Sequence, residues 1–308
     1  MSVSLARLPR FHQTPDQSPK IRITERDLAI LREVADHRFL RSTHFSSLII
    51  GSCQQILRRL QLLYHHGYLE RPRAQIDTYY RGGSRPIVYG LGSKGAALLR
   101  RKGVLTFDRM SWTSANRSAG RLFLDHTLMI ADVVVGIRSE CDASQHLQFI
   151  DGQDLPSCAA EDDDAKRFQW ATSVAGHGSV KLIPDRVFAI ERRQTGERIL
   201  FLLEADRGTE PLTRTDFHQS SIDRKLMLYS QLSSERAFLE RFGCRRVRAL
   251  LVTTSSIRAQ GIQQMMSKHR NAGLFLTSEL TSLVDHKSLL DAAWINRSGE
   301  GESLNDQF

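Results

Sequence analysis

The chain has 308 residues, of which 41% are hydrophobic, and carries a formal net charge of +9 at pH 7. This length accommodates two modest domains, and the lack of any run of about eighteen apolar residues excludes a membrane span. The four cysteines are far apart and form no C-x-x-C pair, which argues against a zinc site and predicts reduced thiols in a cytoplasmic protein.

The positive charge is concentrated in the first third of the chain. Residues 1–110 contain 19 Lys+Arg against 8 Asp+Glu, whereas residues 111–308 contain 24 against 26. A basic segment beside a nearly balanced one indicates a polyanion as the partner of that segment.

The first element in the chain is an arm over residues 1–20, with Pro9, Pro15 and Pro19 among polar residues. We expect it to be flexible and basic. Thr24 and Asp27 then have the spacing of a helix N-cap and its partner. Two further helices are predicted, one opened by Ser42 and one over residues 53–66.

Residues 21–110 have the pattern of a winged helix-turn-helix domain, because three helices are followed by a hairpin that turns at Gly82-Gly83. The third helix would enter the major groove of double-stranded DNA. Gln and Arg side chains read adenine and guanine edges, and arginines at a wing tip hold phosphates. The predicted DNA-binding residues are Gln54, Gln55, Arg58, Arg59, Arg81 and Arg85. The alternative is a winged helix that contacts protein.

Residues 111–120 are predicted to be a linker, and residues 121–141 a helix. Residues 151–178 contain no periodic pattern and are predicted to form a long irregular loop.

Two apolar strands, 182–190 and 198–205, flank a polar turn that contains Gly196, which predicts a hairpin. A turn centred between Gln194 and Thr195 places Asp185 opposite Glu204, and Asp206 then faces the same way. Three converging carboxylates favour a hard cation, Mg²⁺ or Mn²⁺. The alternative leaves Asp185 as a turn cap and the other two as polar residues at a strand end.

The rest of the chain alternates helices and strands. We expect a helix over 218–232 that carries Lys225, a strand over 246–254, a helix over 257–269, a strand over 273–277, and a disordered tail from 297.

This order of elements looks like the restriction-endonuclease-like core, whose motif is PD-(D/E)xK. Pro184-Asp185 and Glu204-Ala205-Asp206 match the motif, except that its last position holds Asp206 in place of lysine. The resemblance implies an α/β (α+β) domain with a central mixed sheet over residues 121–296. It also implies catalytic roles for Asp185, Glu204 and Asp206, with Lys225 supplying the missing positive charge.

More specifically, the chain resembles the replication-relaxation family over about residues 24 to 280. The most distinctive segment is Glu204-Ala-Asp-Arg-Gly-Thr-Glu210, and Asp125-His126 and Arg224-Lys225 also match. The resemblance implies a DNA-binding protein of a mobile element that acts in plasmid replication or in relaxation of DNA at an origin, similar to relaxases of the MOBC type.

Three interpretations follow from these features. The first is metal-dependent nicking of one DNA strand, and the second is a DNA-binding regulator or accessory factor with an inactive nuclease-like domain. The third is a scaffold for mobilisation or replication proteins. A palindromic site would require a homodimer. Each interpretation places the protein in the cytoplasm.

Overall fold

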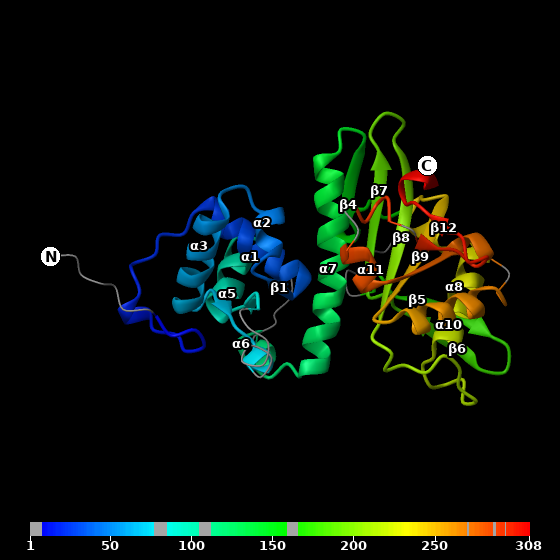
Figure 1. Cartoon of the computed structure of the whole chain (residues 1–308), viewed down its shortest axis with the longest axis horizontal. Coiled ribbons are helices and arrows are strands. Elements are labelled where there is room, and N and C mark those ends of the chain that lie inside the picture. Colours follow the sequence, from blue (N-terminus) through cyan, green and yellow to red (C-terminus); the bar gives the residue numbers. More distant parts are fainter. Residues whose placement is uncertain are drawn as a thin grey trace. The chain divides into compact units, whose positions relative to one another are not determined.

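The computed structural model describes residues 8–76, 85–104, 112–158, 166–269, 271–285, 288–292 and 294–308. The chain divides into two compact units, Met1–Val135 and Gly136–Phe308, called here the N-terminal and C-terminal units. Both combine helices with strands (Figure 1). No helix within these ranges has the length and apolar character needed to cross a bilayer.

The N-terminal unit is built from helices and a small sheet. Its elements in chain order are η1 (Pro15–Gln17), α1 (Glu25–His37), β1 (Phe39–Arg41), α2 (His44–Leu48), α3 (Cys53–His65), β2 (Leu69–Glu70), η2 (Arg73–Gln75), β3 (Val88–Leu91), α5 (Ser93–Arg101) and α6 (Trp112–Arg117). Within the described part of this unit, β3 is the central strand of the small sheet and pairs antiparallel with β1 and β2.

Of the three helix starts predicted in this unit, those at Thr24 and near Cys53 are confirmed. The start assigned to Ser42 is wrong, because α2 begins at His44 after Thr43 and has no side-chain cap. Thr24 caps α1 in a capping box, because its backbone N–H donates to Asp27 at 2.7 Å and its hydroxyl accepts from the Asp27 N–H. Ser52 caps α3 by accepting from the N–H of Gln55. Apolar residues of α1, α3 and α5 then meet in one core that contains Ile30, Leu31, Leu60, Leu63 and Leu99.

The segment predicted to be a flexible arm is tied to the N-terminal unit over its described part. The backbone N–H of Thr14 donates to Nδ1 of His65 at 3.2 Å, and Pro19 O lies 2.9 Å from Nε2 of His66. Arg71 donates to the carbonyl of Arg10. The end of α3 and the residue after strand β2 supply these partners, which sequence periodicity does not indicate.

The burial of His65 makes the stability of the N-terminal unit depend on pH. His65 is 1% exposed, and burial lowers the pKa of His65 to about 4, with help from the neighbouring Arg71. The unfolded state therefore binds more protons below pH 6.5, so stability is lost as pH falls towards 4. We expect a loss of about 2 kcal/mol between pH 7 and pH 5. Urea unfolding at both pH values measures it, and an equal loss in His65→Gln would contradict this origin.

The helix α7 (Arg121–Ala143) crosses the boundary between the units, where the sequence predicts one helix. In the N-terminal unit its Asp132 accepts from Nε of Arg41 at 3.0 Å and lies 2.8 Å from Nε2 of His44. In the C-terminal unit its Glu140 accepts from the hydroxyl of Ser288 at 2.7 Å. Residues 112–117, predicted to be linker, form α6.

The C-terminal unit is an α/β arrangement around a large mixed sheet. Its elements after α7 are β4 (Leu147–Asp151), η3 (Gly152–Asp154), β5 (Trp170–Val174), β6 (Gly178–Leu182), β7 (Arg186–Arg192), β8 (Glu197–Asp206), α8 (Ile222–Ser234), α9 (Ala237–Phe242), β9 (Arg246–Thr253), α10 (Ser256–Met266), η4 (Ala272–Leu274), β10 (Phe275–Glu279), α11 (Leu280–Asp285), β11 (Trp294–Ile295), β12 (Gly301–Glu302) and η5 (Asn305–Gln307).

Over the described residues, the large sheet has seven strands in the order β12-β11-β10-β9-β8-β7-β4, which confirms the expected central mixed sheet. Strands β8, β9 and β10 are parallel, and the other neighbours pair antiparallel. Helices α8 and α10 pack on one face of this sheet (Figure 1), where their apolar residues join those of β8 and β9 in one core.

The structure corrects two expectations in this unit. The irregular stretch predicted up to residue 178 contains β5, which forms a hairpin with β6. The tail predicted to be disordered forms β12 and η5, with Leu304 fully buried and Gln307 donating to Glu302 at 3.0 Å. Both segments are rich in polar residues, and they owe their order to contacts with distant parts of the chain.

Candidate functional site

The predicted hairpin of β7 and β8 has the predicted register. Arg186 pairs with Leu203 and Arg192 pairs with Glu197, so the next step of the ladder sets Asp185 opposite Glu204. The backbone N–H of Asp185 donates to Leu203 O at 3.0 Å, and Oδ2 of Asp185 accepts from the N–H of Ala205 at 2.8 Å. The hairpin therefore places these two carboxylates beside each other.

Glu204 is the centre of a buried hydrogen-bond network. It is 2% exposed, and accepts from Nζ of Lys225 at 2.9 Å and from the hydroxyl of Tyr229 at 2.6 Å. Lys225 and Tyr229 are four residues apart on α8, so one helix face supplies both donors. Nζ of Lys225 also lies 3.0 Å from a carboxylate oxygen of Glu210. We call Asp185, Glu204, Glu210, Lys225 and Tyr229 the acidic site.

The charges of the acidic site perturb one another. Burial raises the pKa of Glu204 to about 7, and Asp185 adds to this shift while Lys225 opposes it. Burial acts to lower the pKa of Lys225, but Glu204 and Glu210 more than offset it and the pKa rises above its ordinary value. Burial and Glu204 together raise the pKa of Tyr229 well above its ordinary value. Shifts of this kind gather at functional sites as well as in structural networks.

Asp206 has a different set of partners from the one predicted. It points to the same face of the sheet as Glu204, but its Oδ2 accepts from Nε of Arg258 on α10 at 2.6 Å and its Oδ1 accepts from the N–H of Gly208. Arg258 also donates to the carbonyl of Glu210. Sequence reasoning did not find Arg258, because the residue is 52 positions away and belongs to no motif.

The three carboxylates are therefore not gathered around one point as the sequence predicts. No group of three or more His, Cys, Asp or Glu side chains in the described part of the chain is arranged to hold a metal ion. Asp185 and Glu204 remain adjacent, and Mg²⁺ is commonly held by one or two carboxylates together with water and phosphate oxygens. Asp185 and Glu204 have the residue types of a two-carboxylate site for such an ion, whereas Asp206 is paired with Arg258.

The predicted DNA-contacting residues of α3 fall into two groups. Gln54, Gln55 and Arg58 are exposed on the helix surface. Arg59 instead donates from Nε to the fully buried Asp27 at 2.8 Å, and its guanidinium also donates to the carbonyl of Arg22. Arg59 therefore has a structural partner, which its neighbour Arg58 does not share.

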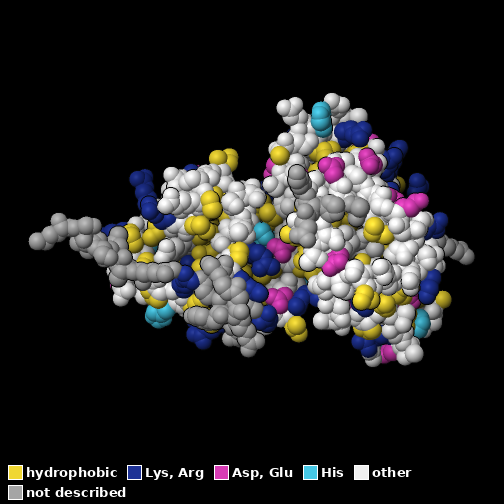
Figure 2. Space-filling model, in the orientation of Figure 1, with side chains coloured by type: hydrophobic (Ala, Val, Ile, Leu, Met, Phe, Trp, Pro, Cys, Tyr) yellow, Lys and Arg dark blue, Asp and Glu magenta, His cyan; other side chains and the backbone are white. Residues whose placement is uncertain are grey.

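The remaining predicted contacts belong to the predicted wing. Arg85 is exposed, whereas Arg81 and the Gly82-Gly83 turn lie outside the described residues. Lys and Arg side chains are found at several separate places on the face drawn in Figure 2.

Comparison with known proteins supports the resemblance seen in the sequence. A sequence model described as replication-relaxation matches residues 31–245, which is more than half of the chain. Searches among curated proteins and among solved structures returned no match. The match includes α3 and the acidic site, and the chain belongs to the replication-relaxation family.

Proposed function

We propose that the protein binds double-stranded DNA through α3 and acts in replication or relaxation of the DNA of a mobile element, where the acidic site nicks one strand. Family membership supports the general role. The observation that carries the nicking proposal is the position of Asp185 directly before the ladder pair Arg186–Leu203, next to Glu204, with Lys225 bound to Glu204. Two carboxylates and one lysine are the residue types of the PD-(D/E)xK motif, with the lysine supplied by α8.

The DNA-binding part of the proposal is based on the order of elements in the N-terminal unit. Helices α1, α2 and α3 precede strands β2 and β3, and β1 completes the small sheet. This is the order of a winged helix, whose third helix enters the major groove. The exposed Gln54, Gln55 and Arg58 are suited to reading base edges there.

In the nicking reaction the residues of the acidic site have three roles. Asp185 and Glu204 would hold Mg²⁺ or Mn²⁺, which when bound supplies Lewis acidity at a phosphoryl oxygen. The ammonium of Lys225 offsets negative charge that develops on the phosphate. Tyr229 and Glu210 orient Glu204 and Lys225 through the hydrogen bonds described above. Arg258 holds Asp206 and the carbonyl of Glu210, and is a positioning residue.

The purified chain and a supercoiled plasmid that carries the origin of its own element test this function. With Mg²⁺ or Mn²⁺ we expect an open circular product, and binding is measured separately by fluorescence anisotropy. Binding without any open circle would contradict nicking. If the protein neither binds the origin DNA nor forms an open circular product, the whole proposal is contradicted.

A second function is favoured by one observation. The last position of the PD-(D/E)xK motif holds Asp206, and Arg258 donates a hydrogen bond to the Asp206 carboxylate. This arrangement suits a DNA-binding accessory factor of replication or mobilisation whose nuclease-like unit does not cut. For such a protein, Asp185→Ala would leave origin function in cells unchanged.

Direct readout by α3 predicts a specific change in affinity. Arg58→Ala is expected to weaken binding to the origin about ten- to a hundredfold, because one guanidinium that contacts a base contributes roughly 1–3 kcal/mol. Arg32→Ala on α1 removes another exposed arginine of the same unit and is expected to change affinity little. Anisotropy titrations at several salt concentrations measure both variants, and equal losses would contradict readout by α3.

A further inference from the structure

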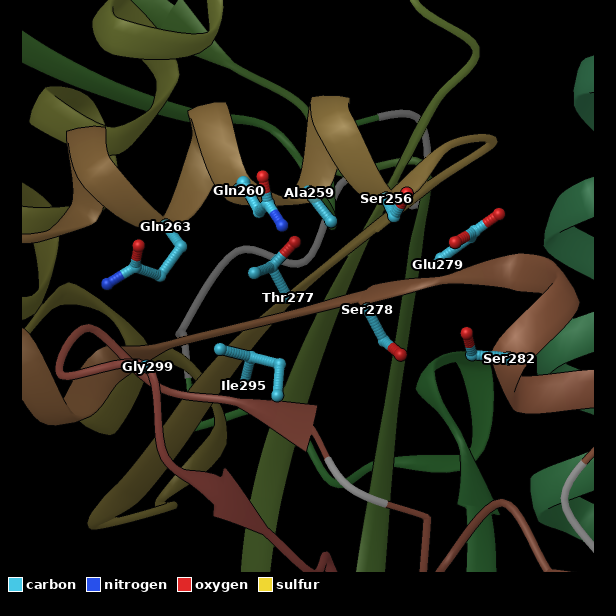
Figure 3. A pocket seen from close by; sticks show the side chains of 10 residues that line it. All are labelled: Ser256, Ala259, Gln260, Gln263, Thr277, Ser278, Glu279, Ser282, Ile295 and Gly299. Atoms are coloured by element: carbon cyan, nitrogen blue, oxygen red, sulfur yellow. The ribbon is translucent and has the colours of Figure 1, made fainter.

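A separate cavity lies in the C-terminal unit between α10 and β10, with a volume of 430 Å³. Ligand pockets in proteins typically have roughly 300–1,000 Å³, so the cavity is large enough for a small organic group. Figure 3 shows side chains from α10 on one side and from β10 on the other, with Ile295 and Gly299 below them.

The described side chains that line the cavity are mainly amides and hydroxyls. They are those of Ser256, Gln260, Gln263, Thr277, Ser278 and Ser282. Neither Lys nor Arg is among the described lining residues, and Glu279 contributes a carboxylate. This composition disfavours a phosphate or another anion. The apolar Ala259 and Ile295 add surfaces on which a flat ring can pack.

Part of this hydrogen-bonding capacity is unused within the protein. Thr277 donates to Leu251 O at 2.9 Å and Gln263 donates to the carbonyl of Arg297. By contrast, the side chains of Gln260, Ser278 and Ser282 make no hydrogen bond with another described residue. Ser278 is only 4% exposed. Its hydroxyl is not among the fully enclosed unpaired polar atoms of the described residues, so it is open to the cavity and to a ligand or water there.

The strand register relates this cavity to Asp206, which lies two residues after Glu204 of the acidic site on β8. Asp206 pairs with Thr253, and Thr253 pairs with Glu279, so these three residues form one row across parallel strands. At a strand spacing of about 4.8 Å, Asp206 and Glu279 are about 10 Å apart. A DNA strand advances about 3.4 Å per nucleotide, so this distance spans roughly three nucleotides.

We infer that this cavity binds a nucleobase, through hydrogen bonds to its edge from Gln260, Ser278 and Ser282. Amide side chains read the edges of bases, and enzymes that bind an unstacked base hold it by such contacts and by packing against apolar side chains. The base comes from a DNA strand held at the acidic site or from a free nucleoside, and both sources present the same chemistry. The strand source rests on the proposed function.

Two kinds of ligand test this site with matched variants. Gln260→Leu removes the amide from the cavity, and Gln264→Leu makes the same change at an exposed position of α10 outside it. The ligands are a single-stranded 12-nucleotide DNA, an abasic strand of the same length and charge, and the four free deoxynucleosides. Anisotropy measures the strands, and the chemical shifts of the Gln263 side-chain amide, which lines the cavity and is retained in Gln260→Leu, report the nucleosides.

We expect the wild type to prefer the base-bearing strand over the abasic strand, and Gln260→Leu to reduce that preference about tenfold, equivalent to about 1.4 kcal/mol. Gln264→Leu should retain the preference. Nucleoside-induced shifts that vanish in Gln260→Leu, without an effect on strands, would support the site with a free ligand. If Gln260→Leu changes neither response, the cavity is not a base site, even where duplex binding through α3 is intact. If the chain binds no DNA, the nucleoside titration still shows whether the cavity binds a base.

Discussion

Exchanging Arg59 for methionine is expected to lower the free energy of unfolding of the N-terminal unit by about 3 to 5 kcal/mol, because it leaves the buried Asp27 without its cation. Burial acts to raise the pKa of Asp27, but hydrogen bonds from Arg59 and Thr24 hold the pKa below its ordinary value. The carboxylate is therefore charged at neutral pH and depends on its partners. Urea unfolding followed by circular dichroism measures the loss.

The neighbouring arginine provides the control for this experiment. Arg58 is exposed on α3, so Arg58→Met should change stability by no more than about 0.5 kcal/mol. The double variant Arg59→Met with Asp27→Asn should recover part of the loss, because it removes the uncompensated charge. If Arg59→Met and Arg58→Met are equally stable, the ion pair of Arg59 with Asp27 contributes nothing to the free energy of unfolding of this unit.

Replacing Lys225 with methionine is expected to reduce nicking about a hundred- to a thousandfold, if the acidic site cuts DNA as proposed. Lys225 is the cation that contacts both Glu204 and Glu210, and loss of one group that stabilises transition-state charge has effects of this size. The rate of open-circle formation from supercoiled plasmid gives the measurement, with far-ultraviolet circular dichroism as the check of folding.

Lys268→Met makes the same change of charge at an exposed position and should cut at the wild-type rate. Asp185→Asn should lose activity to a similar extent as Lys225→Met while duplex affinity stays constant. If a folded Lys225→Met protein nicks at the normal rate, the role assigned to Lys225 is wrong.

The β7–β8 hairpin is a feature that local sequence patterns were sufficient to predict. A short polar turn and two apolar strands are local features, and together they set the pairing of Arg186 with Leu203 and the position of Asp185 beside Glu204. The capping box of α1 was predictable for the same reason, since Thr24 and Asp27 are three residues apart.

The partners of the charged residues could not be read in this way. Asp206 meets Arg258, and Arg59 meets Asp27, across 52 and 32 positions of the chain. Neither pair has a fixed spacing, because the packing of separate helices and strands decides which charges meet. Sequence patterns therefore identified the carboxylates of the acidic site but did not predict that Arg258 would pair with Asp206.

The last two strands also cover one edge of the large sheet. Strands β11 and β12 cover the outer side of β10, and Trp294 at the start of β11 is fully buried. A chain shortened before Trp294 would leave β10 as an open edge with unpaired backbone N–H and C=O groups, which is a template for pairing with other chains. By covering this edge, the polar C-terminal segment prevents strand β10 from pairing with other chains.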